Sequence, residues 1–300
     1  MSNEGESGSF LETGLDWTSE DFSSEEKQQL LAWYEQHHEA EHTKLSRFPD
    51  FWIEHDPGGF KRYRRHMIEI DDASDPDSMP GAAHLFMYLG LYTVFANEKG
   101  ILYLVVNART LGATRAEVVD AFRIAALSAG PFGINAAAEL ADEYLRAWPE
   151  DSGEPGIEWP RGWAPDPDAL KSGIDHSTNE MSDADLAALR GWYERVYGEV
   201  PRFIEVLAAD HPVALKTQRI RLEASLGEAL PAQMAPLSWL LLAAQRQWPT
   251  SILRAGQMAR HLGVRRRQAI ETVFWAGVYA GEATSEVAIE ALAPVLDGWE

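Results

Sequence analysis

The stretch MPGAAHLFMYLGLYTVFANEKGILYLVVNARTLG, residues 79–112, is similar to a second stretch of equal length. The second stretch is LPAQMAPLSWLLLAAQRQWPTSILRAGQMARHLG, residues 230–263, and the two align without a gap. Both copies begin with an apolar residue and Pro, and both end in Leu-Gly. The register continues without a gap, because Ala129-Gly130 matches Ala280-Gly281. Self-similarity at a fixed spacing indicates an internal duplication. Two related halves can build a site that each half completes differently.

Each copy has the pattern of consecutive helices. A Ser or Thr followed three residues later by Glu or Asp marks helix starts near residues 24, 115 and 183. Gly112 follows a helical pattern at the position where a left-handed glycine ends a helix. No useful length of the chain alternates apolar and polar residues with period two. The predicted fold class is all-α.

Composition divides the chain into four parts. Residues 1–20 are rich in Ser, Gly and Glu and are predicted to be a mobile tail. Residues 21–148 form the first repeat and 182–300 the second. The intervening segment 149–181 is a linker, since its first part is rich in Pro, Gly and Asp. The length of 300 residues suits two domains, each with its own core.

Charge and cysteine content exclude several classes of protein. The chain carries 47 acidic and 26 basic side chains, a formal charge of −21, which disfavours nucleic-acid and membrane partners. It has no apolar run near 18 residues and no signal-peptide pattern, so a cytoplasmic protein is expected. The cysteine count is zero, which rules out disulfides, thiolate catalysis and Cys-based metal sites.

The segment GATRAEVVDAF, residues 112–122, follows a helix ending in Ala-Arg and precedes an Ala-Gly pair. With its weaker second copy from Leu262, it resembles the carboxymuconolactone decarboxylase family, which includes the AhpD-like alkylhydroperoxidases. The resemblance covers residues 79–144 and 230–295. It implies two AhpD-like helical domains in tandem. It also implies a homo-oligomer, because single-domain members assemble into rings.

The family's reactive residues are replaced in both copies. AhpD-like members carry a Cys-x-x-Cys-x-x-x-His motif, whose positions fall on Asn97, Gly100 and Leu104, and on Trp248, Ser251 and Ala255. The upstream Glu of the relay falls on Leu85 and Pro236. Because a thiol peroxidase needs a thiolate nucleophile, this chain is not one.

An acid-base set lies on the helix that lines the pocket in the family. His84, Tyr88 and Tyr92 are spaced four residues apart and share one helix face. Glu98 begins the next helix. The set predicts His84, Glu98 and Tyr88 as catalytic residues that take a proton and hold an oxyanion. The alternative is that the tyrosines are core residues, His84 makes an ordinary hydrogen bond and Glu98 only favours a helix N-terminus.

Five residues are candidates for substrate binding. Tyr92 extends the catalytic face, and Asn97 lies where the family's reactive groups sit. Asn135 follows a Gly-Pro-Phe-Gly turn and offers an amide, or caps a helix. Arg64 offers a carboxylate anchor. It and Lys61 recur in the second half as Arg219 and Lys216, which also suits a structural ion pair. Trp275 is the candidate from the second half, whose corresponding helices are rich in aromatic residues.

A zinc site is the rival metal hypothesis. His38-Glu39-Ala40-Glu41-His42 has the H-E-x-x-H spacing, which on a helix places both imidazoles on one face. A third ligand is not identifiable, and the second repeat has no equivalent.

The sequence predicts a cofactor-independent lyase, decarboxylase or isomerase acting on a small aromatic-derived or lactone-like organic acid. The alternatives are a zinc-dependent hydrolase using His38 and His42, and a non-catalytic oligomeric binding protein. The expected partner is a small-molecule substrate, without nucleic acid or membrane.

Overall fold

The computed structural model describes residues 15–37, 48–70, 78–148 and 156–299. Within these ranges the chain forms thirteen α-helices and no strand, which confirms the all-α prediction. The helices of the first half are α1 (Ser24–His37), α3 (Phe48–His55), α4 (Pro57–Ile70), α5 (Gly81–Val94), α6 (Glu98–Thr110) and α7 (Arg115–Ala147).

The second half follows the same order of helices. Its helices are α8 (Asp183–Tyr197), α9 (Arg202–Asp210), α10 (Pro212–Glu223), α11 (Met234–Gln245), α12 (Pro249–His261), α13 (Arg266–Ala280) and α14 (Ala283–Leu296). A shift of 151 residues carries α6 onto α12 and the first part of α7 onto α13.

Backbone conformation repeats at the same spacing. Gly112 and Gly263 have φ of 85° and 77°, and each ends its helix in the left-handed region that favours glycine. Among the described residues the only two non-glycine residues with positive φ are also a matched pair, Ala96 at 51° and Gln247 at 52°. Because such angles are uncommon for residues with a Cβ, their recurrence supports the duplication read from the sequence.

Helix α7 consists of two helical parts joined by a kink. Gly130 has φ 60° and ψ −162°, and Pro131 follows it. By length and composition α7 is the one described helix apolar enough to cross a membrane. Its two straight parts are each shorter than the ~20 residues that a span requires. It packs against α5 and α6 as a core helix.

The centre of the molecule is the contact between α5 and α11, one from each half. The buried apolar residues of helices α5–α14 and of the linker form one continuous cluster. Two separate cores were expected, but the halves share one, because the most apolar helix of each half packs on the other.

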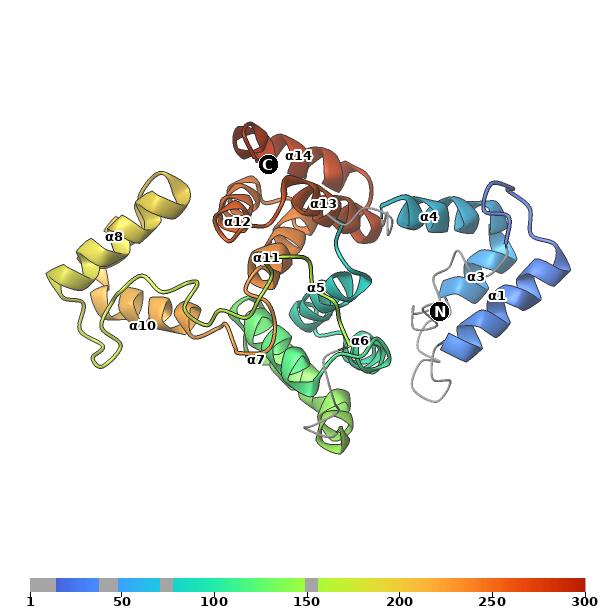
Figure 1. Ribbon diagram of the computed structural model, residues 1–300, viewed down its shortest axis with the longest axis horizontal. Coiled ribbons are helices and arrows are strands. Elements are labelled where there is room, and N and C mark those ends of the chain that lie inside the picture. The colour runs from blue at the N-terminus through green and yellow to red at the C-terminus, as the bar shows by residue number, and fades with distance from the viewer. Residues whose placement is uncertain (1–14, 38–47, 71–77, 149–155, 300) are drawn as a thin grey trace.

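Helices α1, α3 and α4 lie at one side of the central helices, while α8 and α10 lie at the opposite side (Figure 1). The first group has a small core of its own, made by Leu15, Leu30, Ile53 and Phe60. It joins the rest through α4, which packs on α13 of the second half. The domain boundaries remain a prediction.

Two carboxylates bind the halves to each other in matching ways. Asp120 on α7 accepts hydrogen bonds from the backbone N–H groups of residues 229 and 230, at 2.9 and 3.1 Å. Glu271 on α13 accepts from the N–H of Met79 at 3.0 Å and from the hydroxyl of Ser78 at 2.9 Å. Each carboxylate therefore holds the segment that leads into the central helix of the other half.

A buried lysine repeats as well. Lys61 donates to the Glu26 carboxylate at 2.9 Å, and Lys216 donates to Asp185 at 2.8 Å. Each carboxylate also caps the N-terminus of its own helix, α1 or α8. The Lys216 ammonium and the N–H of Asp175 hold the pKa of Asp185 well below its usual value. The structural role proposed for the recurring lysines matches these contacts.

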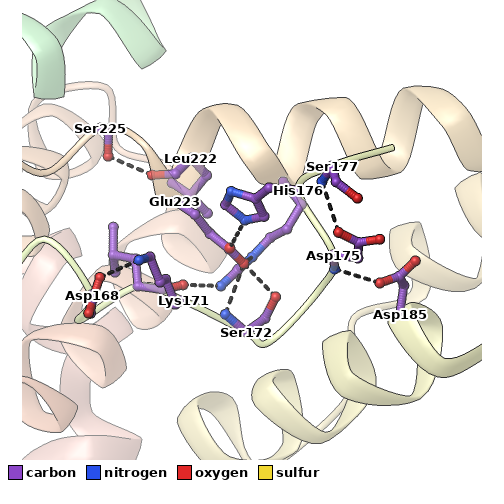
Figure 2. Close-up of polar contacts among 12 residues, drawn as sticks. Asp168, Lys171, Ser172, Asp175, His176, Ser177, Asp185, Leu222, Glu223 and Ser225 are labelled. Carbon is purple, nitrogen blue, oxygen red and sulfur yellow. Dashed lines mark hydrogen bonds and ion pairs between the residues drawn. The ribbon is translucent and has the colours of Figure 1, made fainter. Parts of the chain in front are cut away.

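The linker is fastened to α10 by Glu223 (Figure 2). This buried carboxylate accepts from the Ser172 N–H at 2.9 Å, from Arg219 Nε at 2.7 Å and pairs with His176 Nε2 at 2.6 Å. The Ser172 hydroxyl donates to it too. Burial raises the pKa of Glu223, but the hydrogen bonds outweigh burial and lower it overall. The cluster anchors a segment that lacks regular structure.

Candidate functional site

The aromatic face of α5 meets α13 from the second half. His84 lies 4.6 Å from the Trp275 ring, and Tyr88 lies 5.7 Å from it, centroid to centroid. The Tyr88 hydroxyl donates to the Trp275 carbonyl at 3.4 Å, and its ring lies 4.1 Å from Tyr279. Tyr92 contacts the other edge of Tyr279 at 6.3 Å. The structure thus brings together four predicted site residues, His84, Tyr88, Tyr92 and Trp275.

This cluster is packed rather than hollow. His84 and Tyr88 are each 5% exposed, and Trp275 is 4% exposed. Burial lowers the pKa of His84 to about 3, so its imidazole stays neutral at neutral pH. A neutral, enclosed ring suits a core residue better than a base that exchanges protons with substrate.

The Tyr92 ring packs directly against Gly100 of α6. A Cβ added to Gly100 would stand 2.6 Å from the Tyr92 ring, so the glycine is needed for this packing. Burial raises the pKa of Tyr92 and of the adjoining Tyr279. We call this region, formed by Tyr88, Tyr92, Gly100 and Tyr279, the filled site.

The remaining predicted residues do not join the cluster. Asn97 caps α6 by accepting from the Gly100 N–H at 3.0 Å, and Glu98 is exposed in the first turn. Asn135 is exposed on α7. Arg64 lies 5.3 Å from the Phe60 ring, within the first-half helices. His38 and His42 lie outside the described residues, within which no group of three His, Asp or Glu could hold a metal ion.

The equivalent place in the second half is open. A shift of 151 residues puts Ala243 where the first half has Tyr92, and Ser251 where it has Gly100. Ser128 of the first half takes the place of Tyr279. Ala243 and Ser128 are smaller than Tyr92 and Tyr279, and beside them lies a pocket of about 230 Å³, which we call the open site. It is lined by Ser128, Tyr197, Trp239, Leu242, Ala243, Trp248, Ser251, Arg254, Ala255 and Met258.

The open site has an apolar floor and a polar rim. Buried Ala243, Ala255 and Met258 form the floor, while Ser128 and Ser251 are exposed at the rim. Trp248, which is half exposed, forms part of the wall and is held by Arg246, whose guanidinium carbon lies 4.9 Å from its ring. The pocket thus combines aromatic surface with hydroxyl groups.

Two lining residues have chemistry suited to an anion. Arg254 lies in the pocket wall with its guanidinium carbon 5.8 Å from the Phe203 ring, and it forms no ion pair with any described carboxylate. Burial raises the pKa of Tyr197, which keeps its phenol protonated and able to donate a hydrogen bond. The Gln257 side chain donates to the Tyr197 carbonyl at 3.0 Å and fixes this end of α8.

The sequence analysis singled out neither Arg254 nor Tyr197. A signal was present, because the predicted residues Tyr88, Tyr92 and Asn97 have Trp239, Ala243 and Trp248 as their counterparts in the pocket wall. Of these three replacements only that of Tyr92 by Ala243 makes room, so the signal is the loss of one large ring at a matched position.

No protein-family profile, no curated protein and no solved structure matches this chain. Its function is therefore inferred from its own geometry and from the resemblance carried by its repeats.

Proposed function

We propose that the open site binds a small organic acid. The observation that supports this is the position of the pocket. It opens at Trp248, Ser251 and Ala255, where the resemblance to the carboxymuconolactone decarboxylase family places the reactive residues. The protein would then be a tandem member of that family that uses only its second half for binding.

The lining defines the ligand. The guanidinium of Arg254 matches a carboxylate in charge and in fork geometry. Trp239 and Trp248 offer flat surfaces to an aromatic or conjugated body. The volume of about 230 Å³ is below the ~300–1,000 Å³ of pockets for drug-sized ligands, so the acid is small, of the size of a substituted benzoate.

The proposed reaction is a cofactor-independent lyase step, such as decarboxylation. Arg254 would hold the anionic substrate, and Tyr197 would supply a proton. When the bond to the carboxylate breaks, carbon dioxide leaves and the electron pair remains on the substrate. The Tyr197 phenol then protonates that carbon or its conjugated oxygen, and water restores the phenol. In this scheme Tyr197 and Arg254 take the roles that the sequence suggested for His84, Glu98 and Tyr88.

For location, oligomeric state and partners, our proposal is the one expected from the sequence. We propose a cytoplasmic homo-oligomer without nucleic-acid or membrane partners. The formal charge of −21 supports the absence of nucleic-acid and membrane partners. Exposed apolar side chains support self-association, among them Phe132 at 80% and Phe95 at 52% exposure.

Ligand titration tests the proposal. Small aromatic acids would be screened by thermal shift on the full chain, and ligands found would be measured by calorimetry. Arg254→Gln should weaken binding by roughly tenfold or more, the loss expected for a charged hydrogen bond. Arg146→Gln is the control, because Arg146 is an exposed arginine paired only with Asp142 at 2.8 Å. Equal loss in both variants, or none in either, would refute the assignment.

Turnover separates the enzyme from a binding protein. Tyr197→Phe keeps the ring and removes the proton. It should retain binding and lose product formation, followed as carbon dioxide release or as the change in substrate absorbance. Binding of an acid that wild type never converts would instead favour the non-catalytic alternative.

A further inference from the structure

A larger pocket lies between α4 of the first half and α13 of the second. It measures about 510 Å³ and is lined by His66, Ile70, Arg266, Arg267, Ile270, Glu271 and Phe274. We propose that it binds an aryl phosphate, meaning a phosphate monoester attached to an aromatic group. This site is separate from the open site and does not depend on the function proposed there.

The walls supply positive charge in an acidic protein. Arg266 and His66 are exposed and form no ion pair with the described residues. In sequence, Arg265-Arg266-Arg267 begins α13 and Arg65 precedes His66 on α4, whereas Lys61 and Arg62 of α4 are paired with Glu26 and Glu20. In a chain of charge −21, Arg266 therefore places beside the pocket a positive charge that has no ion-pair partner among the described residues.

Glu271, the one acidic side chain among the described residues of the wall, is already compensated. Glu271 accepts from Arg267 at 2.8 Å, from the Ser78 hydroxyl at 2.9 Å and from the Met79 N–H at 3.0 Å. Its charge is therefore balanced inside the protein. Arg266 remains to meet a phosphate with its guanidinium, and the His66 imidazole is a further hydrogen-bonding group, so together they can engage more than one phosphate oxygen.

The apolar residues of the wall would be covered by a hydrophobic group on the same ligand. Ile70 and Ile270 line the pocket beside Phe274, which is 39% exposed. Inorganic phosphate would leave this surface in water, whereas an aromatic ring would stack on Phe274 and cover the isoleucines. Cations and an aromatic ring in one cavity therefore point to an amphipathic anion.

The matching place in the other half is closed by its own side chains. Arg221 stands at the position of His66 and donates to the Ala126 carbonyl at 2.7 Å. Arg123 stands at the position of Phe274 and pairs with Asp120 at 2.8 Å. Both arginines at this place are therefore bonded within the protein, whereas Arg266 of the α4–α13 pocket forms no ion pair with the described residues.

Calorimetry on the full chain tests this site with phenyl phosphate, inorganic phosphate and phenol as probes. We expect phenyl phosphate to bind about tenfold or more tightly than either fragment, because only it engages both parts of the wall. The double substitution Arg266→Gln and His66→Gln should reduce that affinity by at least about tenfold. Phe274→Ala should remove most of the preference for phenyl phosphate over inorganic phosphate.

Matched variants distinguish this site from the open site. Arg123→Gln, at the closed counterpart, and Arg254→Gln, at the open site, should leave phenyl phosphate affinity unchanged. Absence of binding to wild type, or undiminished binding to the folded double variant, would overturn the proposal. Loss of phenyl phosphate binding in Arg254→Gln alone would also overturn it, because the probe would then occupy the open site.

Discussion

The filled site and the open site occupy matching places in the two halves but differ in what fills them. In the first half Tyr92 and Tyr279 occupy the space, whereas Ala243 and Ser128 leave it empty in the second. The exchange crosses the halves, since Tyr279 belongs to the second half and Ser128 to the first. A duplicated scaffold can thus use one copy for packing and keep the other for a ligand.

The largest difference between the halves is expected at the repeated lysine. Lys216 is fully buried with Asp185, which is 6% exposed, whereas the partner of Lys61, Glu26, is 21% exposed. Lys216→Met leaves a buried carboxylate unpaired and should cost about 3–5 kcal/mol in urea unfolding. Lys61→Met should cost clearly less, because water can reach Glu26.

The double variant Lys216→Met with Asp185→Leu provides the control for that comparison. Removing both charges should recover a large part of the lost stability. If the two single lysine substitutions lowered the free energy of unfolding equally, the two ion pairs would contribute equally to stability and the predicted difference would be wrong.

A pH titration tests whether the packed surroundings of His84, between Tyr88 and Trp275, are dry. His84 has a folded pKa of about 3, below its ordinary value of 6.5, so the unfolded chain binds a proton first as the pH falls. Its contribution is fully present above pH 6.5 and should decrease toward pH 3, by on the order of 3 kcal/mol between pH 6.5 and pH 4.

His84→Leu should remove this slope, measured as unfolding free energy against pH. The variant His211→Gln, at an exposed histidine, should keep it. The carboxyl groups whose pKa values are lowered, such as Glu26 and Glu223, lose their contributions only below about pH 4.5. An unchanged slope above pH 5 in His84→Leu would mean that water reaches this histidine.

The smallest expected effect comes from making the open site resemble the filled one. Ala243→Tyr combined with Ser251→Gly places a phenol where the first half has Tyr92 and supplies the glycine that this packing needs, and the double variant should reduce affinity for the small acid by about tenfold or more. Stability should change by only ~1 kcal/mol, because the new ring enters a space that is already present. Ala243→Ser is the control that preserves the volume, and calorimetry with chemical unfolding measures both quantities.

Much of the fold could be predicted because its signals are local. The spacing of Thr114 and Glu117 predicts the start of α7, and the structure forms both hydrogen bonds of that cap. Gly112 ends its helix with positive φ, as expected. The Glu223 cluster could not be predicted, since it joins the linker to α10 through residues as far as 51 positions apart.

The candidate site was predictable only in part. The repeat identifies the helices that carry the predicted site residues, and His84, Tyr88 and Trp275 do come together in the structure. Which half holds a cavity depends on side chains contributed by the opposite half, and no pattern within one repeat contains that information.

The sequence by itself determined the all-α class and the matched order of helices, because periodicity, capping and glycine turns act over a few residues. Only the tertiary structure decided that the halves share one core, and that Tyr279 closes one site while Ser128 leaves the other open. The physical reason is that close packing is settled by side-chain volumes brought together from distant parts of the chain.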